Sequence, residues 1–271
     1  MKYLLTNSVK HLHIPSVKVE RKFFPEGELY VRVAENIKNK PITIVSNITP
    51  TNLLEVLFIV DAVRQAGGKI KSLTIPFMSY ARQDKMQKYG EAISGEIICF
   101  ALKNLKIPVK IFDLHSDLLK KDFRFKYRTL LSELIKKLPR KNFIIIAPDK
   151  GGLKRASAVA KILKTKVLMI KKKRKNGKVS MTFSKNLFGK DVLIVDDMIS
   201  TGATLIEASK ILKKNNAGEI YCVASHGLFV KNAREKIKKS KIKKIIVSNT
   251  LPVKPSDQIK VIRVEKVLQN K

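Results

Sequence analysis

Residues 192–204, VLIVDDMISTGAT, combine a short apolar run, two aspartates and a small, hydroxylated turn. The apolar run predicts a buried strand, which places Asp196 and Asp197 at its carboxyl end. The turn from Ser200 to Thr204 leads into a segment with helical spacing. Small residues there allow backbone N–H groups to surround a phosphate at the positive end of the helix, whereas adjacent carboxylates suit ribose hydroxyls or a divalent cation. The chain contains no Walker A motif, so this is a different kind of phosphate site.

The same order of short strand and longer helix recurs along the chain. Short runs rich in β-branched residues predict strands at residues 42–46, 70–76, 109–113, 143–147, 192–195, 220–224 and 244–248. Longer segments with a 3.6-residue period predict helices at residues 51–66, 151–163 and 201–214. In the first helix, Thr51 is the expected N-cap and Gly67-Gly68 the expected end. The alternation predicts an α/β protein with doubly wound parallel sheets, which carry helices on both faces.

The length of 271 residues indicates two domains, because a domain has about 150 residues. The strand–helix pattern occurs twice, with a division near LPRK at residues 138–141. We therefore expect two α/β domains, residues 1–140 and residues 141–271, with the last residues able to pack back on the first half. No low-complexity linker separates the halves, so a crevice between domains is the expected ligand site.

The chain is strongly basic. Its 56 Lys and Arg exceed its 22 Asp and Glu by 34, an excess that attracts polyanions such as nucleic acid, anionic lipid or phosphorylated metabolites. The most basic run is KKKRKNG at residues 171–177, which we interpret as a solvated loop or a nucleic-acid patch between a strand and a hairpin. Residues 167–179, however, contain no aromatic side chain that could stack on a nucleobase. Because the excess charge is dispersed, we expect no dedicated nucleic-acid site.

The sequence also bears on the compartment. No apolar run approaches the roughly 18 residues that cross a bilayer, and the chain does not begin with a signal-peptide pattern. Cys99 and Cys222 lie far apart without a CxxC motif, which favours a reducing compartment. We expect a cytoplasmic protein that makes no membrane contact.

Residues 192–204 resemble the loop that binds phosphoribosyl diphosphate (PRPP) in type I phosphoribosyltransferases and in ribose-phosphate diphosphokinases, the PRPP synthetases. In both families this loop holds the 5-phosphate and the acidic pair holds the ribose hydroxyls. The resemblance therefore implies phosphoribosyltransferase-type domains and a ribose 5-phosphate site formed by Asp196, Asp197, Ser200, Thr201, Gly202, Ala203 and Thr204.

Further segments resemble the diphosphokinases in particular, and they follow in matching order. These segments are FFPEGE at 23–28, PFMSYARQD at 76–84, IFDLH at 111–115, PDKGGLKR at 148–155, and Lys172 with Arg174. The short chain and the GEAIS sequence at 90–94 resemble archaeal members. Residues 87–94 differ from the bacterial and mammalian allosteric enzymes, so the resemblance does not extend to their separate phosphate and ADP site or to their hexamer.

The resemblance implies transfer of the β,γ-diphosphoryl group of ATP to the C1 hydroxyl of ribose 5-phosphate, giving PRPP and AMP for nucleotide biosynthesis. The implied ATP-binding residues are Phe24, Glu26, Gly27, Glu28, Arg82, Gln83 and His115. Mg²⁺ would be held by His115 and Asp149. Lys172 and Arg174 would be catalytic, and Arg174 would also contact ribose 5-phosphate; the active lysine is not fixed within 171–173. The family's adenine loop acts across a subunit boundary, which implies at least a homodimer.

Other functions remain open at this point. A type I phosphoribosyltransferase would need the PRPP loop and a base-binding hood, but not the ARQD, DLH or Lys-x-Arg segments. A non-catalytic regulator related to the diphosphokinases would typically lack the catalytic-arm or metal residues, whereas His115, Asp149, Lys172 and Arg174 are all present. A nucleic-acid-binding module is the third alternative, suggested by the net charge alone.

Overall fold

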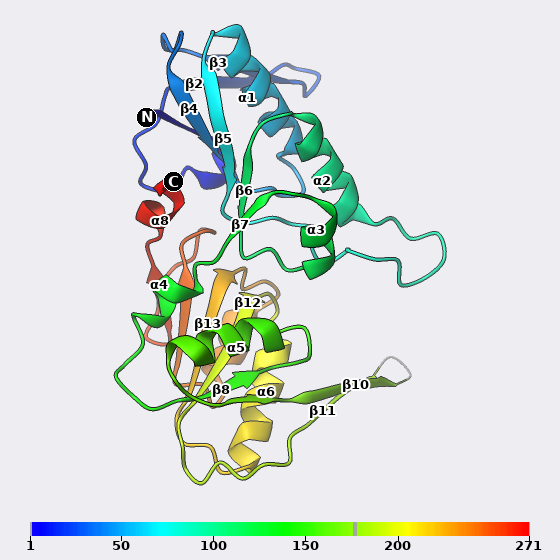
Figure 1. The fold of residues 1–271 in the computed structure, drawn as a ribbon, viewed down its shortest axis with the longest axis vertical. Helices are drawn as coiled ribbons and strands as arrows, with labels where there is room; N and C mark the ends of the chain where they lie inside the picture. Colours follow the sequence, from blue (N-terminus) through cyan, green and yellow to red (C-terminus); the bar gives the residue numbers. More distant parts are fainter. Residues whose placement is uncertain (1, 176–177, 271) are drawn as a thin grey trace. The chain divides into compact units, whose positions relative to one another are not determined.

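The computed structural model describes residues 2–175 and 178–270, with the side chains at 122 and 173–180 left undescribed. The chain forms two compact units, residues 1–128 with 265–271, and residues 129–264 (Figure 1). This division comes earlier than the expected one at residue 140 because helix α4 (Leu131–Ile135) packs on strands of the second unit. The last seven residues group with the first unit.

Unit 1 contains a five-stranded parallel sheet. Its strands, in spatial order, are β1 (Lys2–Leu5), β4 (Pro41–Val45), β5 (Lys69–Ile75), β6 (Val109–Phe112) and β7 (Lys126–Arg128). The other elements are η1 (Asn7–Val9), α1 (Leu53–Gln65), α2 (Ser94–Asn104), α3 (Asp117–Asp122), α8 (Glu265–Gln269) and the antiparallel hairpin of β2 (Val19–Phe23) and β3 (Leu29–Val33).

The two faces of the unit 1 sheet differ in chemistry. On one face, Ile44, Ile75 and Ile111 are fully buried and belong to the same core as Val56 and Ile59 of α1. Because side chains alternate along a strand, the residues directly before and after each of these isoleucines point to the other face of the sheet. That second face includes the polar residues Thr43, Ser72, Thr74 and Lys110.

Unit 2 contains a six-stranded parallel sheet. Its strands, in spatial order, are β15 (Ile259–Ile262), β14 (Lys244–Ser248), β13 (Ile220–Gly227), β12 (Val192–Ile199), β8 (Ile144–Ala147) and β9 (Val167–Met169). The other elements are α4, α5 (Leu153–Ile162), α6 (Ala203–Lys214), α7 (Ala233–Lys238) and the antiparallel hairpin of β10 (Lys171–Lys175) and β11 (Lys178–Thr182).

Helices cover both faces of β12. Ile194 shares a core with Leu205 and Leu212 of α6, whereas the adjacent Leu193 is fully buried on the opposite side. Helix α5 packs against β8 and β12, and α4 packs against β13 and β14. The predicted α/β class with parallel sheets is confirmed.

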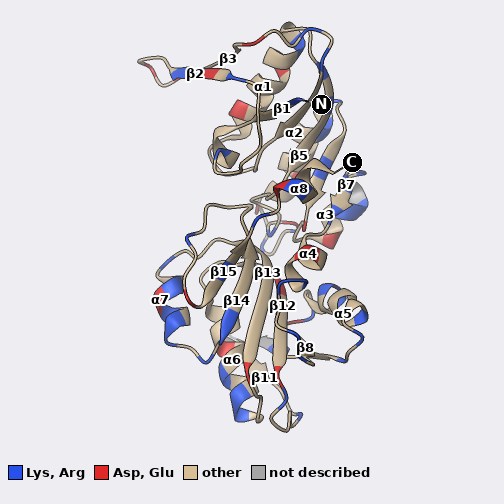
Figure 2. Cartoon of the chain, turned by 90° about the vertical axis from the view of Figure 1, so that its left-hand side faces the viewer, with Lys and Arg blue, Asp and Glu red and all other residues tan. Residues whose placement is uncertain are grey.

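Two local predictions differ from the structure. Helix α1 begins at Leu53, so the N-cap position belongs to Asn52 and not to Thr51. The Asn52 side chain accepts hydrogen bonds from the Thr49 N–H and hydroxyl at 2.7 and 3.0 Å. Residues 171–175 form the first strand of a hairpin rather than a loop before one. Within the described residues, no helix is long and apolar enough to cross a membrane. Lys and Arg are spread over both units (Figure 2).

Candidate active site

The acidic pair lies at the carboxyl end of β12. The Asp197 side chain is 1% exposed, whereas 30% of the Asp196 side chain faces solvent. The Asp197 backbone N–H donates to Asp196 Oδ1 at 2.9 Å, which fixes the first carboxylate against its own strand. Two neighbouring carboxylates held in this way form a compact acceptor group for sugar hydroxyls or a cation.

Arg155 of α5 balances this pair. Its Nη1 lies 3.5 Å from Asp197 Oδ1 and 3.7 Å from Asp196 Oδ1, and its side chain is 16% exposed. Burial and the negative charge of Asp197 raise the pKa of Asp196 well above its usual range, and Arg155 acts against this rise. Arg155 ends the PDKGGLKR segment, and no local signal in the sequence indicates its acidic partners. The packing of α5 on β12 brings them together.

The loop that follows the pair is shaped by Gly202. Gly202 adopts a left-handed conformation with φ of 74° immediately before α6, and a Cβ there would lie 3.1 Å from Ile237 Cδ1. Ser200 O accepts the Val230 N–H at 3.1 Å, so the loop is also bound to the segment that follows β13. Intrahelical bonding starts with Ile206 N–H to Gly202 O at 2.9 Å. The N–H groups of the first helical turn lack intrahelical partners and can bind an anion.

Asp149 lies two residues after the end of β8, in the same unit. Its Oδ1 accepts the Gly152 N–H at 3.1 Å, so the side chain supports the turn into α5. Its Oδ2 lies 3.8 Å from Lys172 Nζ, at the start of the β10–β11 hairpin. The structure thus brings two predicted site residues together. The Arg174 side chain lies outside the described side chains.

In unit 1, Arg82 and Gln83 belong to the segment that follows β5. Ser79 N–H donates to Ile48 O at 2.8 Å, and Gln83 N–H donates to Tyr80 O at 2.8 Å. Gly95 N–H in turn donates to Gln83 O at 2.9 Å. The backbone is therefore anchored, while the side chains of Arg82 and Gln83 remain exposed and free to meet a ligand.

His115 follows β6 and is also exposed. Just before it, Asp113 adopts a positive φ of 43° and its N–H donates to Arg128 O at 2.9 Å. Just after it, the Ser116 hydroxyl caps α3 by accepting the N–H groups of Leu118 and Leu119. The strand end and the capped helix hold the position of His115 from both sides.

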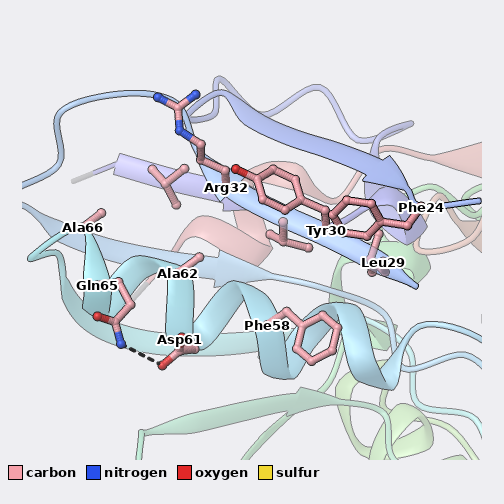
Figure 3. A pocket seen from close by; sticks show the side chains of 11 residues that line it. Phe24, Leu29, Tyr30, Arg32, Phe58, Asp61, Ala62, Gln65 and Ala66 are labelled. Carbon is pink, nitrogen blue, oxygen red and sulfur yellow. Dashed lines mark hydrogen bonds between the residues drawn. The ribbon is translucent and has the colours of Figure 1, made fainter. Parts of the chain in front are cut away.

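The predicted adenine-binding residues form the turn of the β2–β3 hairpin. Phe24 N–H donates to Glu28 O at 2.9 Å, and Gly27 at φ of 92° closes the turn. Glu26 and Glu28 are exposed. The Phe24 ring, 39% exposed, packs edge-on against Tyr30 with centroids 6.1 Å apart. Both rings line a groove of about 590 Å³ between the hairpin and α1 (Figure 3).

The predicted magnesium ligands fit a hard divalent cation in part. Within the described residues, no three His, Cys, Asp or Glu side chains form a metal-binding group. Mg²⁺ characteristically binds through one or two carboxylates and completes its shell with water and substrate phosphates. The partly exposed Asp149 carboxylate, and the crowded pair of Asp196 and Asp197, offer oxygen donors of this kind. The donor chemistry is therefore compatible with Mg²⁺ bound together with a nucleotide.

Comparisons with known proteins identify the family of both parts of the chain. Residues 2–105 match the model of the N-terminal domain of ribose phosphate pyrophosphokinase, and residues 116–262 match the phosphoribosyl transferase domain. The chain is 37% identical over 272 residues to a ribose-phosphate pyrophosphokinase of Pyrococcus abyssi, covering 94% of this chain and 93% of the relative. It is 36% identical over 273 residues to that of Pyrococcus furiosus, covering 96% and 97%.

A solved structure extends the similarity to three dimensions. Phosphoribosylpyrophosphate synthetase from Mycobacterium smegmatis matches with a TM-score of 0.84 and 25% identity, covering 99% of this chain and 96% of that chain. Both units therefore have counterparts in one relative. The chain belongs to the ribose-phosphate pyrophosphokinase family.

Proposed function

We propose that this protein is a ribose-phosphate diphosphokinase that transfers the β,γ-diphosphoryl group of ATP to the C1 hydroxyl of ribose 5-phosphate. The products are PRPP and AMP. The observation that carries the proposal is the β12–α6 connection, where two adjacent carboxylates precede a helix that begins after a left-handed glycine. The chain also contains the N-terminal domain of the family. The first feature suits a phosphorylated ribose, and the second distinguishes the chain from a simple phosphoribosyltransferase.

Ribose 5-phosphate binds at the β12–α6 connection in this proposal. The backbone N–H groups and hydroxyls from Ser200 to Thr204 hold the 5-phosphate at the helix start. Asp196 and Asp197 accept hydrogen bonds from the ribose hydroxyls, and the Arg155 guanidinium favours the ionised form of Asp196. The sugar is thereby oriented with its C1 hydroxyl held for attack on phosphorus.

ATP binds through the exposed residues of unit 1. The Arg82 guanidinium pairs with phosphate oxygens, Gln83 hydrogen-bonds the nucleotide, and Phe24 stacks on adenine while the nearby glutamates accept from the base. His115 and Asp149 would hold Mg²⁺, which supplies charge neutralisation on the ATP phosphates when bound. Lys172 and Arg174 stabilise negative charge on the diphosphoryl group as AMP leaves. The C1 hydroxyl oxygen attacks the β-phosphorus in line with the departing AMP oxygen.

The assay is direct. Purified protein is incubated with ribose 5-phosphate, ATP and Mg²⁺, and the nucleotide products are separated. AMP that forms only when both substrates are present supports a diphosphokinase, whereas ADP would identify an ordinary kinase and contradict the proposal. Incubation of PRPP with free nucleobases provides the control for a phosphoribosyltransferase.

Two further features belong to the proposal. A homo-oligomer of at least two subunits follows if Phe24 and its hairpin turn complete the adenine site of a second copy. A reducing, cytoplasmic setting fits the cysteines, because both Cys99 and Cys222 are free and buried, and burial raises the pKa of Cys99 to about 12.

A further inference from the structure

A basic cavity of about 230 Å³ lies on the polar face of the unit 1 sheet, outside the candidate active site. Its walls come from β4, β5, β6 and β7, from the end of α8 and from Asn270. Three of its lining residues, Lys71, Lys110 and Lys126, are cations, and none of the described lining residues is acidic. The described lining of this cavity therefore has an excess of positive charge.

Lys110 is the central group of this cavity. The whole residue is only 9% exposed, and it lies beside Lys126 in the register of β6 and β7. Among the described residues, its Nζ has one hydrogen-bond partner, the Asn270 carbonyl oxygen at 2.7 Å. An ammonium has three N–H donors, and a buried charge without an opposite charge is costly.

The surroundings increase this cost. Burial lowers the pKa of Lys110, and the charges of Lys126 and Arg128 lower it further. The hydroxyl residues Thr43 and Ser72 also line the cavity and provide neutral hydrogen-bonding groups. An anion with several oxygens would satisfy the free Lys110 donors and neutralise the neighbouring cations at the same time.

The position separates this cavity from the nucleotide site. Lys71, Lys110 and Lys126 lie among the first three residues of β5, β6 and β7. Arg82 and His115 instead follow the carboxyl ends of β5 and β6. In a parallel sheet the amino ends of all strands lie on one side and the carboxyl ends on the opposite side, so one ligand cannot occupy both places.

We infer that this cavity is a binding site for a phosphate group, either inorganic phosphate or the phosphate of a small ester. The bound anion bridges Lys110 and Lys126 and holds the C-terminal residues Leu268–Asn270 against the sheet. The alternative is that Lys110 serves only as a cation at the end of α8, where it offsets the helix dipole through Asn270. The two hypotheses differ in whether phosphate binds at Lys110 and slows amide exchange in the C-terminal residues 265–270.

The test counts bound phosphate by equilibrium dialysis of the full chain with radiolabelled inorganic phosphate. The variant is Lys110→Met, and the matched control is Lys69→Met, which removes an exposed lysine from the same sheet outside the cavity lining. We expect the wild type and Lys69→Met to bind one more phosphate per chain than Lys110→Met. Lys126→Met, at an exposed position, serves if Lys110→Met does not fold, and should weaken that site by about tenfold.

Hydrogen exchange provides an independent measurement. Phosphate should slow amide exchange in residues 265–270 of the wild type and of Lys69→Met, but not of Lys110→Met. Equal phosphate counts in all three proteins would overturn the inference. The inference would also be overturned if Lys110→Met speeds amide exchange in residues 265–270 by the same factor with and without phosphate. Lys110 would then act only on α8. Parallel dialysis with glycerol 3-phosphate identifies whether the free anion or an ester is preferred.

Discussion

Replacing Arg155 by methionine should weaken the use of ribose 5-phosphate more than the use of ATP. The guanidinium lies 3.5 Å from Asp197 and 3.7 Å from Asp196, and its side chain is largely buried. At an effective dielectric constant of about 20, opposite charges at this distance attract by about 5 kcal/mol, which is an upper limit for each contact. Solvent around Asp196 reduces that value. We expect kcat/KM for ribose 5-phosphate to fall about 10- to 100-fold, equivalent to roughly 1.4–2.7 kcal/mol.

The pH profile should change in a defined direction. Arg155 lowers the pKa of Asp196, which burial and Asp197 otherwise raise. Without Arg155 the carboxyl remains protonated to a higher pH, so the acid limb of kcat/KM for ribose 5-phosphate should move to higher pH. The KM for ATP should stay close to the wild-type value, because the proposed nucleotide residues Arg82 and Gln83 belong to unit 1, whereas Arg155 and its acidic partners belong to unit 2.

Two control variants make this prediction refutable. Arg155→Lys keeps the charge but loses the fork of donors, so it should recover part of the loss and most of the pH profile. Arg140→Met removes an exposed arginine elsewhere in unit 2 and should leave both measurements unchanged. Thermal unfolding of each variant identifies losses that arise from misfolding. An Arg155→Met enzyme that folds and keeps its acid limb would refute the assigned role.

The other predictions concern the same unit. Gly202→Ala forces alanine into a positive φ against Ile237, so it should cost about 1–3 kcal/mol of unfolding free energy and raise the KM for ribose 5-phosphate. Lys172→Ala should lower kcat about 10²- to 10³-fold while nucleotide binding, measured by calorimetry, persists; Lys171→Ala provides the register control. Because the pKa of Asp196 is raised, its ionisation disfavours folding, so Asp196→Asn should raise the Tm at neutral pH, abolish turnover and leave the Tm unchanged below about pH 3.8.

The sequence predicted the strand and helix framework well where local signals agreed. Residues 192–195 are apolar, glycine occupies the left-handed position at 202, and the following residues have helical spacing, so the β12–α6 connection was predictable without tertiary information. The first residue of α1 was not predictable in this way, because Thr51 and Asn52 are both good capping residues. The choice depends on the loop, where Asn52 binds Thr49 instead.

Residues that act through distant partners escaped prediction. Arg155 and the acidic pair are about 40 positions apart along the chain, and only the packing of α5 on β12 brings them together. Lys110 belongs to the sequence VKIF, where alternation predicts a lysine on a solvated face. The C-terminal segment covers that face, and nothing near Lys110 in the sequence indicates it. Local pattern therefore gives elements, while burial of charge depends on tertiary contacts.

The two anion-binding features proposed here solve opposite electrostatic problems. At the end of β12, two carboxylates crowd together, and Arg155 from the adjacent helix lowers the cost, so the site can receive sugar hydroxyls without binding anions itself. In our proposal, phosphate is bound there by backbone N–H groups at the start of α6, which carry no net charge. On the unit 1 sheet, Lys110 has a carbonyl partner but no described carboxylate. A site of the first kind recognises a sugar phosphate by shape, whereas a site of the second kind selects for charge. We therefore expect ionic strength to weaken phosphate binding at Lys110 more than ribose 5-phosphate binding at Gly202.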